Sequence, residues 1–385
     1  MTPATRSLDH MLSDEHKEVR RTCEKFALKE IAPFAYEWEE AEEFPRELYL
    51  KAAEAGVLGI SFPEAVGGAG GDALHAMMVT EGLMHGGSSG VIAGLGSLGI
   101  GLPPIVQAGD AAQIDRFVRP TIKGETISAL AITEPGTGSD VAAVRTTARR
   151  DGDDYLIDGS KLFITSGIRA DYVTVLCRTG EDAHGGLTFF VVEKGMPGYD
   201  ASRRLKKTGW RASDTAEMTF ESVRVPVANR VGPEGSAFVT LMRNFQGERL
   251  MLAAMGHAAA ELSLAKATEW SKERQAFGRP IGSFQAIRHK FAEMATKIEA
   301  AKQLTFATAW RFANDEYPVR EITAAKLFSS RIACEVADEC IQIHGGYGYM
   351  REYEVERAYR DLRLNRIGAG TDEIMLDVIG RSYGI

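Results

Sequence analysis

The stretch QIHGGYGYMREYEVERAYRDLRLNRIGAGTDEIM, residues 342–375, places a glycine-rich turn at each end of a charged, helix-like segment. Gly345, Gly346 and Gly348 mark the first turn, and Gly368 and Gly370 mark the second. Glycine adopts positive φ angles and lets a ligand approach the backbone closely. The segment therefore indicates backbone wrapped around a flat or phosphorylated molecule, although a pair of purely structural turns fits these residues equally well.

The composition is typical of a globular protein with a large core. Of the 385 residues, 44% are hydrophobic and 25% are charged, which predicts two or three domains. The net charge of −8 and the lack of like-charge runs argue against binding to nucleic acid or to an anionic membrane surface. Cys23, Cys177, Cys334 and Cys340 form no C-x-x-C pair, so we expect free thiols in a reducing, cytoplasmic setting and no metal centre.

No targeting segment or membrane span is predicted. The first 20 residues contain acids and no apolar core, unlike a secretory signal or a transit peptide. The uncharged stretch 86–109 is long enough to cross a bilayer, but it holds eight glycines and the pair Pro103-Pro104. We expect no membrane insertion, and we interpret the stretch as a buried helix with a proline-marked turn.

Hydrophobic periodicity divides the chain into three parts. Apolar residues recur every three or four positions near the N-terminus, as at Val19, Cys23 and Phe26. Short β-rich runs such as DYLIDGSKLFIT (154–165) follow, and long helical patterns then cover 283–314 and 319–343. The predicted fold is mainly α with a central β domain: an N-terminal helical domain (1–124), a middle β-barrel-like domain (125–233) and a C-terminal four-helix bundle (234–385).

Two motifs of the middle part combine a strand with a turn rich in small and hydroxyl residues. They are TEPGTGSD (133–140) and KLFITSG (161–167). The hydroxyls of Thr133, Ser139 and Thr165 could line a polar aromatic ring on which Phe163 stacks. Taken singly, each motif is better explained as an ordinary turn.

A third motif, SKERQAFGRPIGSFQ (271–285), lies in the third part of the chain. Arg274 and Phe277 follow a long helix, and Gln285 opens the next one. An arginine beside a helix N-terminus could clamp a diphosphate, while a solvated surface arginine is the ordinary interpretation. TEPGTGSD, KLFITSG, ERQAFGRPIGSFQ and QIHGGYGYMREY together occur in the order and at the spacing seen in acyl-CoA dehydrogenases, and this resemblance covers nearly the whole chain.

The resemblance implies FAD as redox cofactor, a homotetramer built as a dimer of dimers, and oxidation of a fatty acyl-CoA to the trans-2-enoyl-CoA. Electrons would pass to an electron-transfer flavoprotein. By similarity, the residues that face the flavin are Ile132, Thr133, Gly138, Ser139, Phe163 and Thr165. Those that hold the diphosphate and adenosine, partly from a neighbouring subunit, are Arg274, Phe277, Gln285, Gln342 and Gly346. Thr371 and Glu373 would close the cofactor site.

The sequence departs from many family members at the catalytic base. These members carry a glutamate just before the final Gly-Thr pair, whereas this chain reads IGAGT and has Ala369 there. It resembles the long-chain and isovaleryl types, which place the base in an E-R-L triplet on a helix, here Glu248-Arg249-Leu250. The resemblance thus implies that Glu248 is the base and that Arg249 steadies it and the thioester-holding turn.

The helical pattern around Glu248 is consistent with a buried base. On a helix its side chain shares a face with Leu241 and Phe245, and burial among apolar side chains disfavours a charged carboxylate. Abstraction of a weakly acidic α-proton needs such a raised pKa. The alternative is a rim carboxylate that reaches solvent or pairs with Arg249 or Arg243.

By resemblance, the backbone N–H at Ala369 and a flavin ribityl hydroxyl stabilise the enolate, and the β-hydride goes to flavin N5. The remaining residues implied in substrate binding are Ser139, Ile92, Gly96, Gly368 and Gly370. Gly96 replaces a larger polar residue below the acyl cavity and Gly368 replaces a tyrosine of many members, which predicts a medium, long or branched acyl chain, although a small linear acyl group also fits. His344 is interpreted as structural. An oxidase-like relative, a dehydrogenase of an unusual CoA ester and a catalytically silent binding protein remain alternatives.

Overall fold

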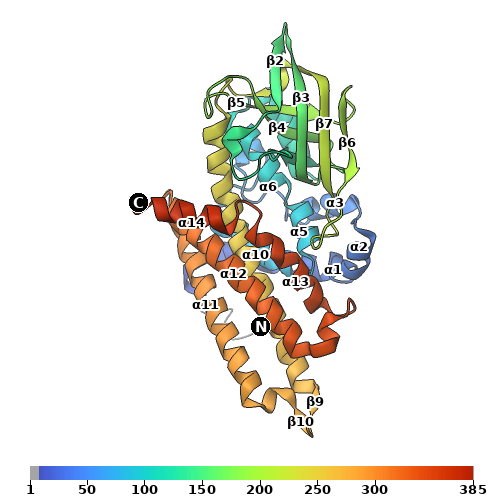
Figure 1. Ribbon diagram of the computed structural model, residues 1–385, viewed down its shortest axis with the longest axis vertical. Helices are drawn as coiled ribbons and strands as arrows, with labels where there is room; N and C mark the ends of the chain where they lie inside the picture. The colour runs from blue at the N-terminus through green and yellow to red at the C-terminus, as the bar shows by residue number, and fades with distance from the viewer. Residues whose placement is uncertain (1–7, 385) are drawn as a thin grey trace.

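The computed structural model describes residues 8–384 as an elongated molecule with a β sheet at one end and long helices at the other (Figure 1). Shorter N-terminal helices lie beside the junction of the two. The predicted class, mainly α with a central β part between two helical parts, is confirmed. The exact division at 124 and 233 stays a prediction.

The N-terminal part is a cluster of short helices around the longer α1 and α4, which pack against each other. Both begin at a side-chain cap, Ser13 for α1 and Asp72 for α4. The helices are α1 (Asp14–Glu30), α2 (Ala35–Ala41), α3 (Glu47–Glu54), α4 (Ala73–Met84), α5 (Ser89–Leu95), α6 (Leu98–Gly101), α7 (Pro103–Ala108), α8 (Ala111–Gln113) and α9 (Arg119–Ile122).

The uncharged stretch 86–109 is not one helix, contrary to prediction, but the three short helices α5, α6 and α7. Gly96 ends α5, and Pro103 begins α7 at a first-turn position, where its missing N–H costs no hydrogen bond. Between residues 8 and 384 no single helix has the length and apolar composition of a membrane span; the bent pair Ser89–Leu95 and Leu98–Ala108 meets that test only when joined.

The middle part forms one sheet with the strand order β6-β7-β3-β2-β4-β5-β8, and β1 pairs in parallel with β4. A core of alternating strand residues, among them Tyr155, Phe190 and Met218, is buried on one side of it. The strands are β1 (Ser128–Ala131), β2 (Thr147–Asp151), β3 (Asp154–Thr165), β4 (Tyr172–Arg178), β5 (Leu187–Glu193), β6 (Tyr199–Arg204), β7 (Thr215–Pro226) and β8 (Arg230–Val231).

The C-terminal part is built on three long helices. α10 packs against α11, α12 and also α4 of the N-terminal part, so the bundle and the N-terminal helices share one apolar cluster. The elements are α10 (Ala237–Glu273), the hairpin β9 (Gln275–Ala276) and β10 (Arg279–Pro280), α11 (Gln285–Ala313), α12 (Val319–His344), α13 (Glu354–Leu362) and α14 (Asp372–Arg381). In Figure 1 the hairpin lies at the end of the bundle far from the sheet.

Candidate active site

Glu248 lies on α10, three turns into the helix, and its side chain is half-buried. Burial raises the pKa of this carboxyl to about 7, and the positive charges of Arg249 and Lys326 partly offset the rise. No hydrogen bond or ion pair joins Glu248 to another residue in the range 8–384, and Arg243 is exposed. The carboxylate is therefore a desolvated, unpaired base, which is the form that proton abstraction near neutral pH requires.

The turn at residues 368–370 lies against the same part of α10. Arg249 donates from Nε to the carbonyl oxygen of Ala369 over 3.1 Å, and Lys326 of α12 donates to that of Gly370 over 2.5 Å. Ala369 has a left-handed φ of 53° and Gly370 a φ of 110°. Thr371 then caps α14, accepting a hydrogen bond from the Ile374 amide. Two cationic side chains thus hold two consecutive carbonyls of the turn.

Lys326 was not singled out by the sequence analysis. It is fully buried, and burial lowers the pKa of its ammonium to about 8. Its neighbours three and four positions away form a buried face of mixed apolar and hydroxyl side chains, so no apolar periodicity marks this lysine in the sequence: Ile322, Thr323, Ser329 and Ser330. A lysine in the middle of such a face costs free energy unless an anionic or polar group compensates it.

The predicted acyl-cavity residues lie beside this site. Ile92 is buried in one apolar cluster with Leu252 and Met255 of α10, and Ala369 packs against that cluster. A Cβ at Gly368 would lie 3.7 Å from Leu252 Cδ1, in ordinary van der Waals contact, so the glycine leaves unfilled the space that a side chain would take beside this cluster. Gly96 ends α5, four residues after Ile92.

The turn after β1 is fixed to β3 by a buried ion pair. Lys161, fully buried, donates to the carbonyl of Ile132 and to Glu134, both over 2.9 Å. Glu134 also accepts hydrogen bonds from the backbone amides of Arg145 and Thr146. The turn that carries the predicted flavin residues is therefore fixed against the KLFITSG segment. The sequence analysis gave no role to Lys161 of that segment or to its partner Glu134.

Phe163 is presented outward from this region. The pairing of β3 with β7 shifts register between Lys161 and Ile164, and Phe163 takes a left-handed φ of 61° with its side chain 64% exposed. Ser139 and Gly138 lie on the exposed turn, while Thr165 is half-buried in β3. A large exposed aromatic ring on a strained backbone indicates a surface that a flat partner covers.

The first turns of α10 connect this β region to the Glu248 region. Ile132 and Leu241 belong to one buried apolar cluster, and Phe245 packs against it. The guanidinium of Arg249 lies 5.9 Å from the centre of the Phe245 ring. The turn that follows β1 and the proposed base therefore share one packed environment.

A second pocket lies at the far end of the bundle, with a volume of about 410 Å³. Trp270 and Tyr347 line it together with Arg274, whose guanidinium lies 5.6 Å from the Tyr347 ring, and a Cβ at Gly346 would meet no atom within 4 Å. His344 stacks on Trp270 and contacts the Cys340 carbonyl over 2.7 Å. The interpretation of His344 as a structural residue agrees with these contacts.

Of the other predicted cofactor residues, Phe277, Gln285 and Gln342 lie near the same end, whereas Glu373 lies on α14, away from it (Figure 1). Phe277, in the turn between β9 and β10, is 95% exposed and has a φ of 52°. Gln285 is the first residue of α11, Gln342 is exposed on the last turn of α12, and Glu373 is exposed in the first turn of α14.

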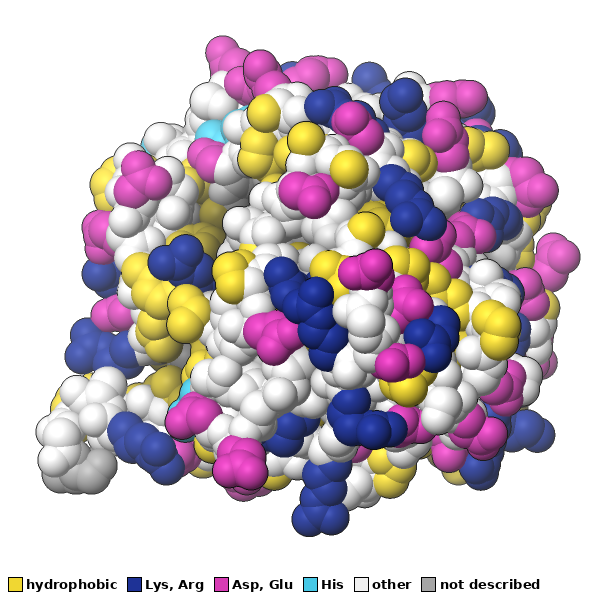
Figure 2. Space-filling model, turned by 90° about the horizontal axis from the view of Figure 1, so that it is seen from above, with side chains coloured by type: hydrophobic (Ala, Val, Ile, Leu, Met, Phe, Trp, Pro, Cys, Tyr) yellow, Lys and Arg dark blue, Asp and Glu magenta, His cyan; other side chains and the backbone are white. Residues whose placement is uncertain are grey.

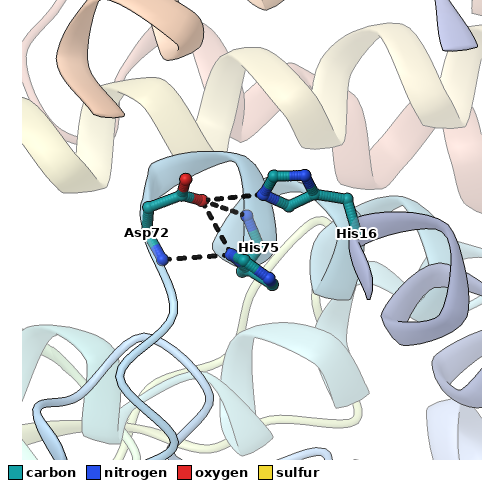
Figure 3. Close-up of side chains that lie close together, drawn as sticks. All are labelled: His16, Asp72 and His75. Carbon is teal, nitrogen blue, oxygen red and sulfur yellow. Dashed lines mark hydrogen bonds and ion pairs between the residues drawn. The ribbon is translucent and has the colours of Figure 1, made fainter. Parts of the chain in front are cut away.

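One further cluster of the described residues has metal-ligand spacing: His16, Asp72 and His75 (Figure 3). Asp72 accepts from the His75 amide over 2.9 Å, His16 Nε2 lies 3.1 Å from the Asp72 carboxylate, and both histidines complete capping boxes at the starts of α1 and α4. Two helix N-termini with inward amides favour an anion over a cation. The cluster is explained by helix capping.

Comparison with known proteins places the chain in a family. Family models for the acyl-CoA dehydrogenase N-terminal, middle and C-terminal domains match residues 13–125, 129–223 and 236–384. The mitochondrial long-chain specific acyl-CoA dehydrogenase of Sus scrofa is 38% identical over 96% of this chain and 87% of its own length. The chain belongs to the acyl-CoA dehydrogenase family.

Solved structures support the same assignment. A probable acyl-CoA dehydrogenase from Mycobacterium abscessus matches with a TM-score of 0.95 and 48% identity, covering 97% of this chain and all of the other. A glutaryl-CoA dehydrogenase from Mycobacterium smegmatis in complex with FADH2 matches with a TM-score of 0.92 and 27% identity over 98% of this chain and 97% of its own. The protein is an acyl-CoA dehydrogenase enzyme with FAD as cofactor.

The residues of this acyl-CoA dehydrogenase fit FAD. The outward Phe163 beside the Thr133 and Ser139 hydroxyls suits a flat, polar ring, and the exposed Arg274 beside open glycine backbone suits a diphosphate. However, one chain does not bring these two sets together, because the sheet and the β9–β10 hairpin lie at opposite ends of the molecule in Figure 1. The face shown in Figure 2 carries interspersed acidic and basic side chains, with no broad patch of one sign.

Proposed function

We propose that this acyl-CoA dehydrogenase uses Glu248 as the base that removes the α-proton of a medium-chain, long-chain or branched acyl-CoA. The observation that carries the proposal is the unpaired carboxylate of Glu248, whose pKa burial raises to about 7, beside a turn that Arg249 and Lys326 hold. Ala369, on that turn, has no side chain able to accept a proton.

Each residue has one task in this proposal. Glu248 removes the α-proton, and its neutral form then carries that proton. The fixed turn offers the backbone amide of Ala369 to the thioester oxygen, where negative charge develops. FAD, when bound, supplies the acceptor for the hydride that leaves the β-carbon. Trans-2-enoyl-CoA is the product.

The test is Glu248→Gln, a nearly isosteric change that removes the base. Turnover should fall by about 10²–10⁴ or more while FAD and acyl-CoA still bind. Glu269→Gln is the matched control, since Glu269 lies on the same helix but is exposed and forms a surface ion pair with Lys272. An unaltered rate in Glu248→Gln would refute the assignment of the base. In the double variant Glu248→Gln/Ala369→Glu, partial recovery is expected if both positions approach the same α-carbon.

The acyl group can be identified from the absorbance of the bound flavin. Without oxygen, a panel of straight and branched saturated acyl-CoAs is added, and bleaching identifies those that the enzyme oxidises. The room at Gly368 and the small residue at Gly96 predict stronger bleaching by medium, long or branched chains than by butyryl-CoA. Bleaching by short straight chains alone would contradict this part of the proposal.

We also propose that a second copy of the chain completes each FAD site in a homotetramer. Phe163 lies on β3, whereas Arg274 and Phe277 lie at the β9–β10 hairpin, and Figure 1 shows these elements at opposite ends of one chain, which supports this arrangement. The test mixes Glu248→Gln with Arg274→Gln subunits by co-refolding or co-expression. If a site takes Glu248 from one chain and Arg274 from its neighbour, mixed assemblies regain one intact site. Failure to regain activity in verified mixed assemblies would refute the shared site.

The electron acceptor is proposed to be an electron-transfer flavoprotein. Anaerobically reduced, product-bound enzyme should reduce such an acceptor rapidly and react only slowly with oxygen. Rapid reoxidation by oxygen alone would support the oxidase-like alternative.

A further inference from the structure

Two buried cations converge on the turn beside Glu248, and the proposal above gives neither of them a task beyond holding that turn. Arg249 is 7% exposed and Lys326 is fully buried. They bind the carbonyl oxygens of adjacent residues, Ala369 and Gly370, from two different helices, α10 and α12. The turn is thus clamped from two sides.

The surroundings of Lys326 do not neutralise it in the way usual for a buried lysine. Its one hydrogen bond to a described residue goes to the neutral carbonyl of Gly370. Lys302, the other fully buried lysine of the bundle, instead donates to the carboxylate of Glu261 over 2.9 Å. A buried ammonium without a directly bonded anion is costly, which indicates that nearby negative charge compensates it.

The charged groups facing this site come from every element packed against it. From α10 these are Glu248 and Arg249, and from the start of α14 it is Asp372, which both Arg366 and Arg331 already bind. Tyr317, from the connection between α11 and α12, faces Arg249. Asp372 attracts Lys326 more strongly than Glu248 does, but its carboxylate is already bonded to Arg331 and Arg366, so among these described groups the anion without a bonded cation is Glu248.

We propose that Lys326 is a positioning residue for the dehydrogenation: its buried charge keeps Glu248 ionised and holds the thioester-binding turn in place as negative charge moves to the substrate. This inference rests on the proposed role of Glu248. When Glu248 takes the α-proton it becomes neutral, and one unit of negative charge develops on the substrate. The two cations remain, so the positive potential of the site then favours the charged substrate.

The test measures kcat/KM against pH in Lys326→Met and Lys326→Arg, both loaded with FAD. The positive charge of Lys326 lowers the pKa of Glu248, so its removal in Lys326→Met should move the acidic limb of the pH–rate profile to higher pH. At a pH below both limbs, kcat/KM of Lys326→Met should therefore be lower than that of the wild type. Lys326→Arg keeps the charge and should retain the wild-type acidic limb.

The basic limb of the profile of kcat/KM against pH is an independent test of the charge on Lys326. Burial lowers the pKa of Lys326 to about 8, so the wild-type rate should decline as the pH rises through that value. Arginine stays charged, and Lys326→Arg should lose this decline. Lys302→Met is the control, a buried lysine removed elsewhere in the bundle, which should change stability and leave both limbs in place.

The outcomes separate the two proposals. If Glu248→Gln is inactive but Lys326→Met keeps the wild-type acidic limb, the inference about Lys326 is wrong and the base assignment stands. If Lys326→Met and Lys326→Arg lose activity equally, without any movement of the limbs, Lys326 is only a packing residue. An active Glu248→Gln would overturn the assignment of the base, whatever the lysine variants show.

Discussion

The half-buried carboxylate of Glu248, the proposed base, should make the folded protein less stable, and Glu248→Gln should reveal this cost. The folded structure raises the pKa of Glu248 from 4.5 to about 7 through burial. For an acid whose folded pKa is raised, the folded state holds the proton more tightly than the unfolded state. Stability from this group is therefore greatest at low pH and is lost as the pH rises from about 4.5 to about 7.

The magnitude follows from linkage. A pKa rise from 4.5 to about 7 corresponds to about 3.4 kcal/mol once Glu248 is fully ionised in both states. At pH 5 only about 0.8 kcal/mol of this is present, so most of the cost appears between pH 5 and pH 8. A glutamine has no charge to desolvate, and its variant should gain about 2.5 kcal/mol relative to wild type between these two pH values.

The assay is urea unfolding of the FAD-loaded wild type and of Glu248→Gln at pH 5 and pH 8, at one protein concentration. Equal concentrations matter because assembly and cofactor binding both contribute to the measured free energy. Glu269→Gln, at an exposed position, should show no such pH-dependent gain. A Glu248→Gln variant whose stability relative to wild type is the same at both pH values would refute the reasoning that Glu248 is desolvated in the folded state.

Two further substitutions test the turns around the cofactor and the substrate. Lys161→Met leaves the buried Glu134 carboxylate without its bonded cation, so it should lower the free energy of unfolding by about 3–5 kcal/mol. It should also release flavin, measured as the flavin-to-protein absorbance ratio after gel filtration. The double variant Lys161→Met/Glu134→Gln should recover part of the stability and part of the bound flavin. Ala369→Gly removes a left-handed alanine and should stabilise by about 0.5–1 kcal/mol in thermal unfolding, with turnover unchanged because the backbone N–H stays; a loss of activity would show that the alanine methyl group itself is needed.

The sequence predicted the elements whose periodicity is strong. β3 covers the predicted run 154–165, and α11 and α12 begin and end within two residues of the predicted patterns. β6 was missed because YDASRR has mostly exposed or half-buried residues and shows no apolar alternation. Residues 86–109 were predicted as one helix because low charge and apolar content do not reveal where glycine and proline interrupt a chain.

Some residues of the candidate site could likewise be predicted from the sequence, and others could not. Glu248 and Arg249 could be found because they lie together in one triplet, and the three-dimensional turn they contact was already marked by its glycines. Lys326 and Glu134 could not be assigned a role from the sequence. Lys326 bonds to the backbone carbonyl of Gly370, 44 residues away, and Glu134 pairs with Lys161, 27 residues away. Contacts of this kind leave no local pattern.

If Glu248 on α10 is the base, as proposed, its position explains why the turn carries an alanine. With a glutamate at both positions, two carboxylates would share one desolvated site, and the pKa of one of them would rise further, leaving it protonated at neutral pH. Arg249 and Lys326 bind backbone carbonyls of the turn and no carboxylate there, and the positive charges of both lower the pKa of Glu248. An uncharged residue at position 369 is therefore what a base at position 248 requires. A carboxylate introduced at position 369 should support turnover only in a variant whose residue 248 is neutral.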